Sequence, residues 1–274
     1  MSRLIIESGH TERQYWQDLW RYRELFYVLA WRDISVRYKQ TVIGVVWAVL
    51  QPLALTVIFT VISKMANFGS EGVPYPLWIF AAQLPWQFFA ASLTASSQSL
   101  IANANLVSKV YFPRMIVPAG AIVTSMVDFL ITFVIFLLMM AWYHVLPTWR
   151  FVAVPFLMIL AFMTALGPGL LITALNVKYR DFRYIIPFII QIGVYISPVI
   201  YSTPVIEQKF PNWTWLYTLN PMVGVIDGFR WALLDGKGGI TLSSFILSVG
   251  VTSILVVWGI SYFRKTERTF ADVI

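Results

Sequence analysis

Cysteine is absent from the 274-residue sequence, and histidine occurs only twice. Without cysteine there can be no disulfide framework and no thiol chemistry. His10 and His144 fall in a predicted tail and a predicted loop, which is a poor start for a metal site. No GxxxxGK[ST] phosphate loop and no Ser/His/Asp or clustered carboxylate arrangement occurs. We therefore expect no cofactor, no metal and no nucleotide hydrolysis in this chain.

Charged residues are also scarce, at 12%, whereas 58% of residues are hydrophobic. A soluble domain carries about 25% charged residues, so this balance indicates a membrane protein surrounded mainly by lipid. The net charge of +7 could suggest a nucleic-acid partner. Basic residues in a membrane protein have a simpler use, because they hold loops on the cytoplasmic side, and we expect no nucleic-acid binding. The first ten residues do not resemble a cleavable signal peptide.

Six segments are long and apolar enough to cross a bilayer, which takes about 20 residues. They run from Val42 to Ile62, Leu77 to Ile101, Met115 to Trp142, Phe151 to Val177, Tyr184 to Tyr201 and Leu242 to Phe263. Prolines at 52, 85, 168 and 187 fall inside or near the ends of these spans. Membrane helices tolerate proline where neighbouring groups satisfy the freed carbonyls, so we expect kinks rather than breaks.

A seventh apolar stretch, Phe210 to Leu234, is interrupted by the Asn220-Pro221 step and by two charged residues. These interruptions predict two short re-entrant or interfacial helices on the outer side, protected by protein. Asp227 and Arg230 are three residues apart and so share one helical face. We expect them to pair and hold an outer gate in place. The alternative is an exposed ion pair worth less than about 1 kcal/mol.

Basic residues are distributed unevenly over the predicted loops. Of the 20 Lys and Arg residues, 15 fall on the side of the predicted spans that carries both termini. The other five fall on the opposite side: Lys64, Arg150, Lys209, Arg230 and Lys237. Because cytoplasmic loops are enriched in Lys and Arg, both termini are predicted to be cytoplasmic.

An amphipathic segment precedes the first span. Between Tyr15 and Trp31, apolar residues recur near helical spacing and charged residues occupy other faces, which indicates a helix lying in the inner interface. Its role could equally be to anchor the N-terminus. The expected fold is an all-α membrane protein with an interfacial N-terminus over 1–40, a transmembrane domain over 41–263 and a cytoplasmic tail over 264–274.

Only Asp128 is an ionisable residue deep inside a predicted span. Such an acid costs several kcal/mol unless it faces protein or water. It could line a pathway or be a structural, hydrogen-bonded acid. One isolated acid is weak support for ion-coupled transport, so we expect the energy source to lie outside this chain.

Four sequence blocks resemble a known family. RDISVRYKQTVIGVVWAVLQPL (32–53) is similar to the R-D-x-x-V-R-Y-K-Q and T-x-x-G-x-x-W-x-x-x-Q-P-L motifs of ABC-2 type permeases that export polysaccharides. The other blocks are LVSKVYFPRMIVP (106–118), NVKYRDFRYIIPFIIQIGVYISPVIY (176–201) and LNPMVGVIDGFRWALL (219–234), in the same order as in the family.

The resemblance covers about residues 25 to 265 and implies a transport subunit rather than an enzyme. It implies a homodimer with two copies of a separate ABC ATPase subunit, which would carry the ATP and magnesium. The implied substrate is a polysaccharide linked to a lipid such as undecaprenyl diphosphate, with O-antigen as the leading candidate. The implied location is the bacterial inner membrane.

The resemblance also implies roles for particular residues. An inner gate that receives the lipid headgroup would contain Arg32, Arg37, Tyr38 and Lys39, whose cations could instead contact anionic lipid. The ATPase contacts would include Lys109, Tyr111, Phe112, Arg114, Tyr179, Arg180 and Asp181, although such loops also anchor orientation. Independently of the resemblance, the candidates for lining a channel are aromatic residues in spans with small and polar neighbours: Trp47, Trp86, Phe88, Tyr195 and Tyr201. They could instead be interfacial or packed aromatics.

Two other classes of function stay open on sequence alone. One is an ABC-2 permease for a drug or a lipid. The other is a polyprenyl-phosphate sugar transferase, which would need a carboxylate pair or metal site at the inner interface. Only Asp33 and Asp181 are placed for that role.

Overall fold

A computed structural model describes residues 12–39, 42–66, 68, 70–179 and 181–270, except for the side chains of 12–14, 42–45 and 48. All regular structure in these ranges is helical. The N-terminal half contains α1 (Glu12–Arg21), α2 (Arg23–Tyr38), α3 (Val42–Met65), α4 (Tyr75–Ala102), α5 (Ala104–Lys109) and α6 (Ile116–Trp142). The C-terminal half contains η1 (Trp149–Ala153), α7 (Val154–Lys178), α8 (Phe182–Ile196), α9 (Thr203–Lys209), η2 (Pro211–Trp213), α10 (Thr214–Thr218), α11 (Pro221–Leu233) and α12 (Leu242–Glu267).

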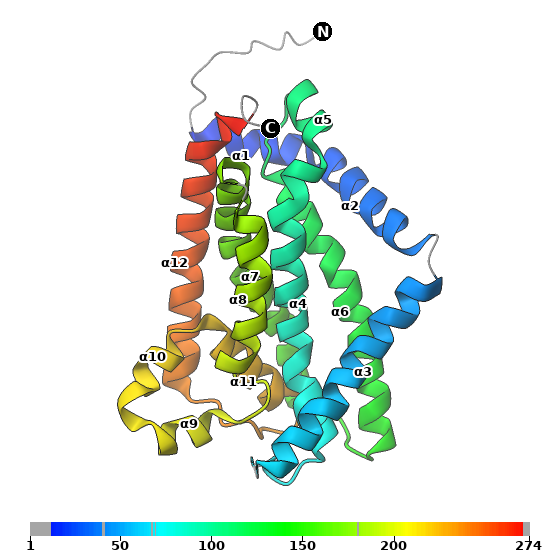
Figure 1. The fold of residues 1–274 in the computed structure, drawn as a ribbon, viewed down its shortest axis with the longest axis vertical. Helices are drawn as coiled ribbons and strands as arrows, with labels where there is room; N and C mark the ends of the chain where they lie inside the picture. The colour runs from blue at the N-terminus through cyan, green and yellow to red at the C-terminus, as the bar shows by residue number, and fades with distance from the viewer. Residues whose placement is uncertain (1–11, 40–41, 67, 69, 180, 271–274) are drawn as a thin grey trace.

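The long helices lie roughly side by side around α4 (Figure 1). α4 packs against α3, α6, α7, α8 and α11, while α12 packs against α7. Aromatic rings fill the space between α4, α6 and α11: Phe80 and Phe136 have ring centroids 6.0 Å apart, and Phe129 lies 6.0 Å from Phe229. The two ends of the bundle differ. α1, α5 and the end of α12 lie at one end, and α9, α10 and α11 lie toward the other (Figure 1).

Small residues allow α7 and α12 to approach each other closely. A Cβ on Gly259 would lie 2.2 Å from the carbonyl oxygen of Gly167, so only glycine fits at this crossing. Nearby, the hydroxyls of Thr164 and Thr252 are 2.9 Å apart. Small residues and interhelical hydroxyl bonds are the usual means of packing helices where water does not drive association.

Among the residues that the structure describes, three helical segments are long and apolar enough to cross a membrane: Ile116–Trp142, Trp149–Lys178 and Leu242–Glu267. They coincide with three of the six predicted spans. α4 has the necessary length of 28 residues but carries many Ser and Gln side chains. Most of its side chains are buried between other helices, including Gln83, Ser92 and Ser96. A helix enclosed by protein can carry polar groups that lipid would not accept.

α8 is shorter than the predicted fifth span, because it ends at Ile196 after 15 residues. The next residue, Ser197, is extended, with φ −89° and ψ 153°. Ser197 precedes Pro198, and the residue before a proline is disfavoured in the helical region. The predicted span reached Tyr201 because the apolar composition continues past the break. α8 is too short to qualify as a span by length and composition, whereas α3 has 24 residues and has the length that a span requires.

The predicted interfacial segment forms two helices, α1 and α2, separated at Tyr22. The stretch from Phe210 to Leu234 is also divided, as its interruptions predict, into η2, α10 and α11. Asn220 is the N-cap of α11 and accepts a hydrogen bond from the backbone N–H of Met222 at 3.0 Å. Pro221 stands at the first position of α11, where its missing N–H costs nothing. α11 has 13 residues, fewer than a bilayer requires.

Candidate functional site

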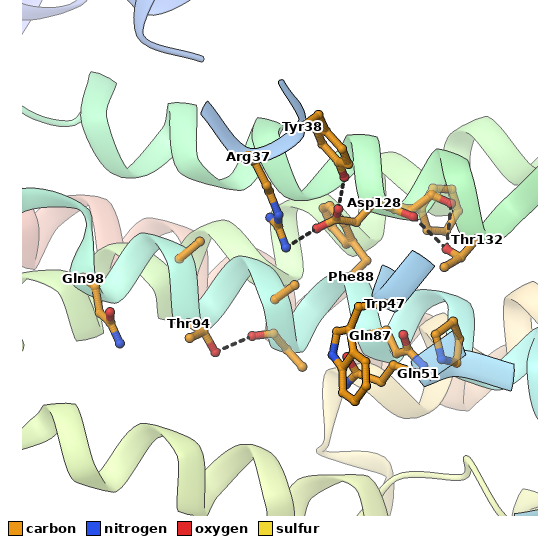
Figure 2. Close-up of a pocket in the computed structure, with 15 residues that line it drawn as sticks. Arg37, Tyr38, Trp47, Gln51, Gln87, Phe88, Thr94, Gln98, Asp128 and Thr132 are labelled. Carbon is orange, nitrogen blue, oxygen red and sulfur yellow. Dashed lines mark hydrogen bonds and ion pairs between the residues drawn. The ribbon is translucent and has the colours of Figure 1, made fainter. Parts of the chain in front are cut away.

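A cavity of about 490 Å³ lies where the end of α2 meets α3, α4 and α6 (Figure 2). Its volume is within the range of ligand sites, about 300 to 1,000 Å³. The lining combines a cation, an acid, amides, hydroxyls and aromatic rings. The polar and aromatic members are Arg37, Tyr38, Trp47, Gln51, Gln87, Phe88, Thr94, Gln98, Asp128, Phe129 and Thr132.

Helical spacing brings these side chains to one place. On α4, Gln87, Ala91, Thr94 and Gln98 follow at intervals of four, three and four residues, which puts them on one face. The lining pairs on α3 (47 and 51) and on α6 (128 and 132) are each four residues apart. Three helices therefore present aligned stripes to the cavity, and the last turn of α2 closes one side.

Asp128 is held by both side chains at the end of α2 (Figure 2). Arg37 Nη2 lies 2.7 Å from Asp128 Oδ2, and the Tyr38 hydroxyl donates a hydrogen bond to Asp128 Oδ1. The Asp128 side chain is 19% exposed and that of Arg37 is 47% exposed. Burial, followed by the hydrogen bond to Asp128, raises the pKa of Tyr38 far above its usual value. Tyr38 is therefore a neutral donor at physiological pH.

The other predicted gate residues do not line this cavity. Arg32 Nη2 lies 2.6 Å from Asp33 Oδ1 and donates to Asn103 Oδ1 at 2.7 Å, at the junction of α4 and α5. Lys39 follows α2, and its backbone N–H donates to the Ser35 carbonyl at 2.8 Å. The structure thus separates Arg32 and Lys39 from the Arg37 and Tyr38 pair.

Two of the five predicted channel aromatics, Trp47 and Phe88, line the cavity. Trp47 is 62% exposed, whereas Trp86 is packed between helices and would contact a Cβ added to Gly193 of α8 at 2.6 Å. The Tyr201 hydroxyl donates to the carbonyls of Tyr195 and Ile196 and so closes the end of α8. Trp86 and Tyr201 therefore have packing and capping roles within the chain, while Tyr195 is exposed on α8.

The predicted ATPase contacts around α5 are partly inaccessible. Lys109 and Tyr111 are exposed, but Phe112 is 3% exposed and packs in the apolar cluster near the ends of α4, α7 and α12. Arg114 is bound to Glu267 at the end of α12: its backbone N–H donates to Oε1 at 2.6 Å and its Nη1 to the backbone carbonyl at 2.5 Å. In this conformation, only Lys109 and Tyr111 of these four present their side chains to a partner.

Glu267 joins three separate parts of the chain. Besides Arg114, it accepts a hydrogen bond from the Tyr15 hydroxyl at 2.8 Å. The guanidinium of Arg264 lies over the Tyr15 ring at 4.7 Å. The α5–α6 connection, the start of the interfacial segment and the end of α12 are thus tied together. No pattern in the local sequence around Glu267 predicts its contacts with Arg114 and Tyr15, which are 153 and 252 residues away.

The second predicted contact region is the junction of α7 and α8. Tyr179 is 49% exposed, and Lys178 Nζ lies 5.1 Å from the centroid of its ring. Asp181 is exposed at the start of α8. Arg180 lies outside the described residues.

Asp227 and Arg230 are fully buried, which excludes the alternative of an exposed ion pair. Arg230 Nη1 lies 3.9 Å from Asp227 Oδ1, and the guanidinium lies over the Trp78 ring at 4.4 Å. Arg230 also donates to the carbonyls of Tyr201 at 3.0 Å, Val199 at 2.9 Å and Trp78 at 3.4 Å. The pair therefore ties α11 to α4 and to the turn after α8.

Sequence reasoning missed the amides Gln51, Gln87 and Gln98 as lining residues. Gln51 lies four residues after Trp47 on α3, and Gln87 and Gln98 are eleven residues apart on α4. This helical spacing places each amide on the same face as other lining residues, and it could have been used to predict them. Among the described residues, no three His, Cys, Asp or Glu side chains are grouped so that they could hold a metal ion.

The described residues form an all-helical bundle that includes apolar helices long enough to cross a membrane, and a polar and aromatic cavity lies between α2, α3, α4 and α6. Residues 24–234 match the ABC-2 type transporter family, and the chain belongs to that family. The resemblance of the four sequence blocks to this family is confirmed.

Curated relatives match over nearly their whole lengths. An "O-antigen export system permease protein RfbA" of Klebsiella pneumoniae is 29% identical over 253 residues, which cover 92% of this chain and 95% of that protein. A protein of the same name from Myxococcus xanthus is 24% identical and covers 94% and 98%, respectively. The "Polysialic acid transport protein KpsM" of Escherichia coli is 21% identical over 86% of this chain and 91% of its own length.

Proposed function

We propose that this chain is the permease subunit of an ATP-driven ABC exporter that moves a lipid-linked polysaccharide, O-antigen in the first instance, across the bacterial inner membrane. The observation that carries the proposal is the family membership together with end-to-end similarity to proteins named for O-antigen export and polysaccharide transport. The drug or lipid exporter and the sugar transferase have no comparable support.

The proposed assembly is a homodimer with two copies of a separate ABC ATPase, which binds ATP and magnesium. The chain has no phosphate loop of its own, which is consistent with a separate motor. Lys109 and Tyr111 beside α5 and Tyr179 at the α7–α8 junction are exposed and supply the proposed contacts. Motion of the α5 region would reach α12 through Arg114 and Glu267, which are hydrogen-bonded.

In the proposed topology six helices cross the membrane and both termini are cytoplasmic. The end of the bundle with α1, α5 and the end of α12 faces the cytoplasm (Figure 1). The five basic residues assigned to the outer side support this orientation, because four of them make contacts around the start of α4, α9 and the end of α11. These contacts are Lys64 with Tyr75, Lys209 with Phe68, Arg230 with Trp78, and Arg150 with Asp235. The positive-inside rule then places the opposite, more basic end in the cytoplasm.

Deleting the gene tests the proposal. We expect the deletion strain to lose surface O-antigen while lipid-linked glycan accumulates inside, and the full-length gene to restore export. Lipopolysaccharide gels and immunoblots of intact and lysed cells measure both effects. Normal surface glycan with altered drug or phospholipid export would refute the proposal, and so would loss of glycan synthesis itself.

A further inference from the structure

Asp128 contacts Arg37 and Tyr38, and the family resemblance implies no role for these contacts. Its carboxylate lies near the middle of α6 and accepts from Arg37 and Tyr38, the last two side chains of α2. These contacts join the interfacial segment to a long apolar helix across 90 positions in sequence. They are among the polar contacts that fasten the end of α2 to the bundle.

The two donors suit a phosphate as well as they suit a carboxylate. An arginine guanidinium presents planar, parallel donors that match the oxygens of either group. The Tyr38 hydroxyl is a neutral donor, since burial and the bond to Asp128 raise the pKa of this tyrosine. Arg32, whose guanidinium contacts Asp33 and Asn103, does not line the cavity.

The space for such an anion lies beside the same donors. Arg37, Tyr38 and Asp128 all line the cavity of about 490 Å³. Trp47 offers an aromatic face there, and Gln87 offers an amide, which are groups that bind the sugar next to a phosphate well. A phosphate that reached Arg37 through this cavity would meet the Asp128 carboxylate on the same donors. Two anions at that distance repel each other, so the phosphate and the Asp128 carboxylate would bind these donors competitively.

We propose that Asp128 competes with the phosphate of the substrate's lipid carrier for Arg37 and Tyr38, two of the gate residues that the resemblance assigns to the lipid headgroup, and that Asp128 occupies these donors until the substrate displaces it. Displacement removes this polar tie between the last turn of α2 and α6, two helices that also pack against each other. Asp128 is thus a positioning residue that competes with the substrate. The inference rests on the proposed function, because it takes the substrate to carry a phosphate-linked lipid.

The competition predicts the sign of a mutational effect. Asp128→Asn removes the competing charge but keeps a hydrogen-bond acceptor of the same shape. The variant should bind a phosphate probe about three- to fivefold more tightly, the range expected for loss of a partly exposed ion pair. Arg37→Gln should bind it at least fivefold more weakly. If Asp128 only orients Arg37, both substitutions weaken binding.

The experiment measures binding of farnesyl diphosphate to the purified full-length chain in detergent micelles by calorimetry. Asp235→Asn is the matched control, because Asp235 pairs with Arg150 at 3.1 Å, away from the cavity. This control should bind as the unmodified chain does. Tighter binding by Asp128→Asn that disappears in the double variant with Arg37→Gln supports the inference. Equal or weaker binding by Asp128→Asn in a folded protein, judged by its tryptophan fluorescence melting curve, overturns it.

Three further probes distinguish the source of the phosphate. Inorganic pyrophosphate should compete with farnesyl diphosphate, and farnesol should show no dependence on Asp128. If pyrophosphate alone binds as tightly as the prenylated form, the ligand is a free phosphate and the lipid-carrier assignment is wrong. If vesicles of phosphatidylglycerol compete as well as the diphosphate does, the cations serve the bilayer and the inference also fails.

Failure of this inference can be distinguished from failure of the proposed function. Loss of surface glycan in the deletion strain tests export, whatever Asp128 does. Failure of the binding pattern with intact glycan export would remove only the competition between Asp128 and substrate.

Discussion

Replacing Arg230 should destabilise the chain more than replacing any partly exposed arginine. Its guanidinium is fully buried, pairs with Asp227 and donates to three backbone carbonyls. Arg230→Met keeps a long apolar side chain but leaves the buried Asp227 without its cation. Removing one partner of a buried ion pair costs about 3 to 5 kcal/mol, and each buried carbonyl that loses its donor adds to that cost.

Arg150→Met is the matched control for this substitution. Arg150 pairs with Asp235, whose side chain is 62% exposed, so the loss should be about 1 kcal/mol or less. The double variant Arg230→Met with Asp227→Asn should recover part of the stability, because it removes the unpaired buried charge while Asn can still accept from Thr203. We therefore predict the order of stability of the three variants rather than a single free-energy change.

The assay is thermal unfolding in detergent, followed by intrinsic fluorescence from the 12 tryptophans. We expect Arg150→Met to melt near the unmodified chain, the double variant lower, and Arg230→Met lowest. If Arg230→Met melted with Arg150→Met, or if the double variant were less stable than Arg230→Met, the buried charge pair would not be what stabilises this end of the bundle.

Two further predictions concern the close helix crossing and the α5 region. Gly259→Leu should reduce the yield of folded chain, because its Cβ would meet the Gly167 carbonyl at 2.2 Å, whereas Gly250→Ala on the same helix has open space and should be neutral; detergent gel filtration compares them. Tyr111→Ala should lower glycan export per folded chain at a much smaller cost in stability than Phe112→Ala, which should cost about 3 to 5 kcal/mol, since Tyr111 is exposed and Phe112 is buried. Export that is normal in Tyr111→Ala would count against an ATPase contact there.

Much of the helical layout could be predicted from composition and length alone. The helix bounds of α6 and α12 fall within one to four residues of the predicted spans, because long apolar runs have few alternatives in a membrane. The division of the stretch after Phe210 followed from the Asn220-Pro221 step, since proline starts a helix well and cannot continue one. The Ser197-Pro198 step similarly indicates the early end of α8. The apolar residues beyond it led to the prediction of a longer span.

The site could be predicted only in part, because its contacts join distant segments. The motif in 32–53 pointed to Arg37 and Tyr38, and the isolated acid pointed to Asp128, yet no local pattern relates positions 37 and 128. The burial of Phe112 likewise depends on contacts between segments far apart in sequence. Its aromatic ring next to basic residues was read as an exposed contact surface, whereas the ring packs into an apolar cluster built from helices far away in sequence.

Transport by the reconstituted complex tests the central proposal most directly. The chain and its ATPase partner would be placed in liposomes with a fluorescent glycan on a polyprenyl diphosphate, and appearance of the glycan on the side away from the ATPase sites would be followed after adding ATP and magnesium. We predict ATP-dependent transport of the diphosphate-linked glycan, a much slower rate for the same glycan on an uncharged polyprenol, and loss of transport with Arg37→Gln. ATP-dependent transport that ignored both the diphosphate and Arg37, or no transport of any glycan by an active complex, would contradict it.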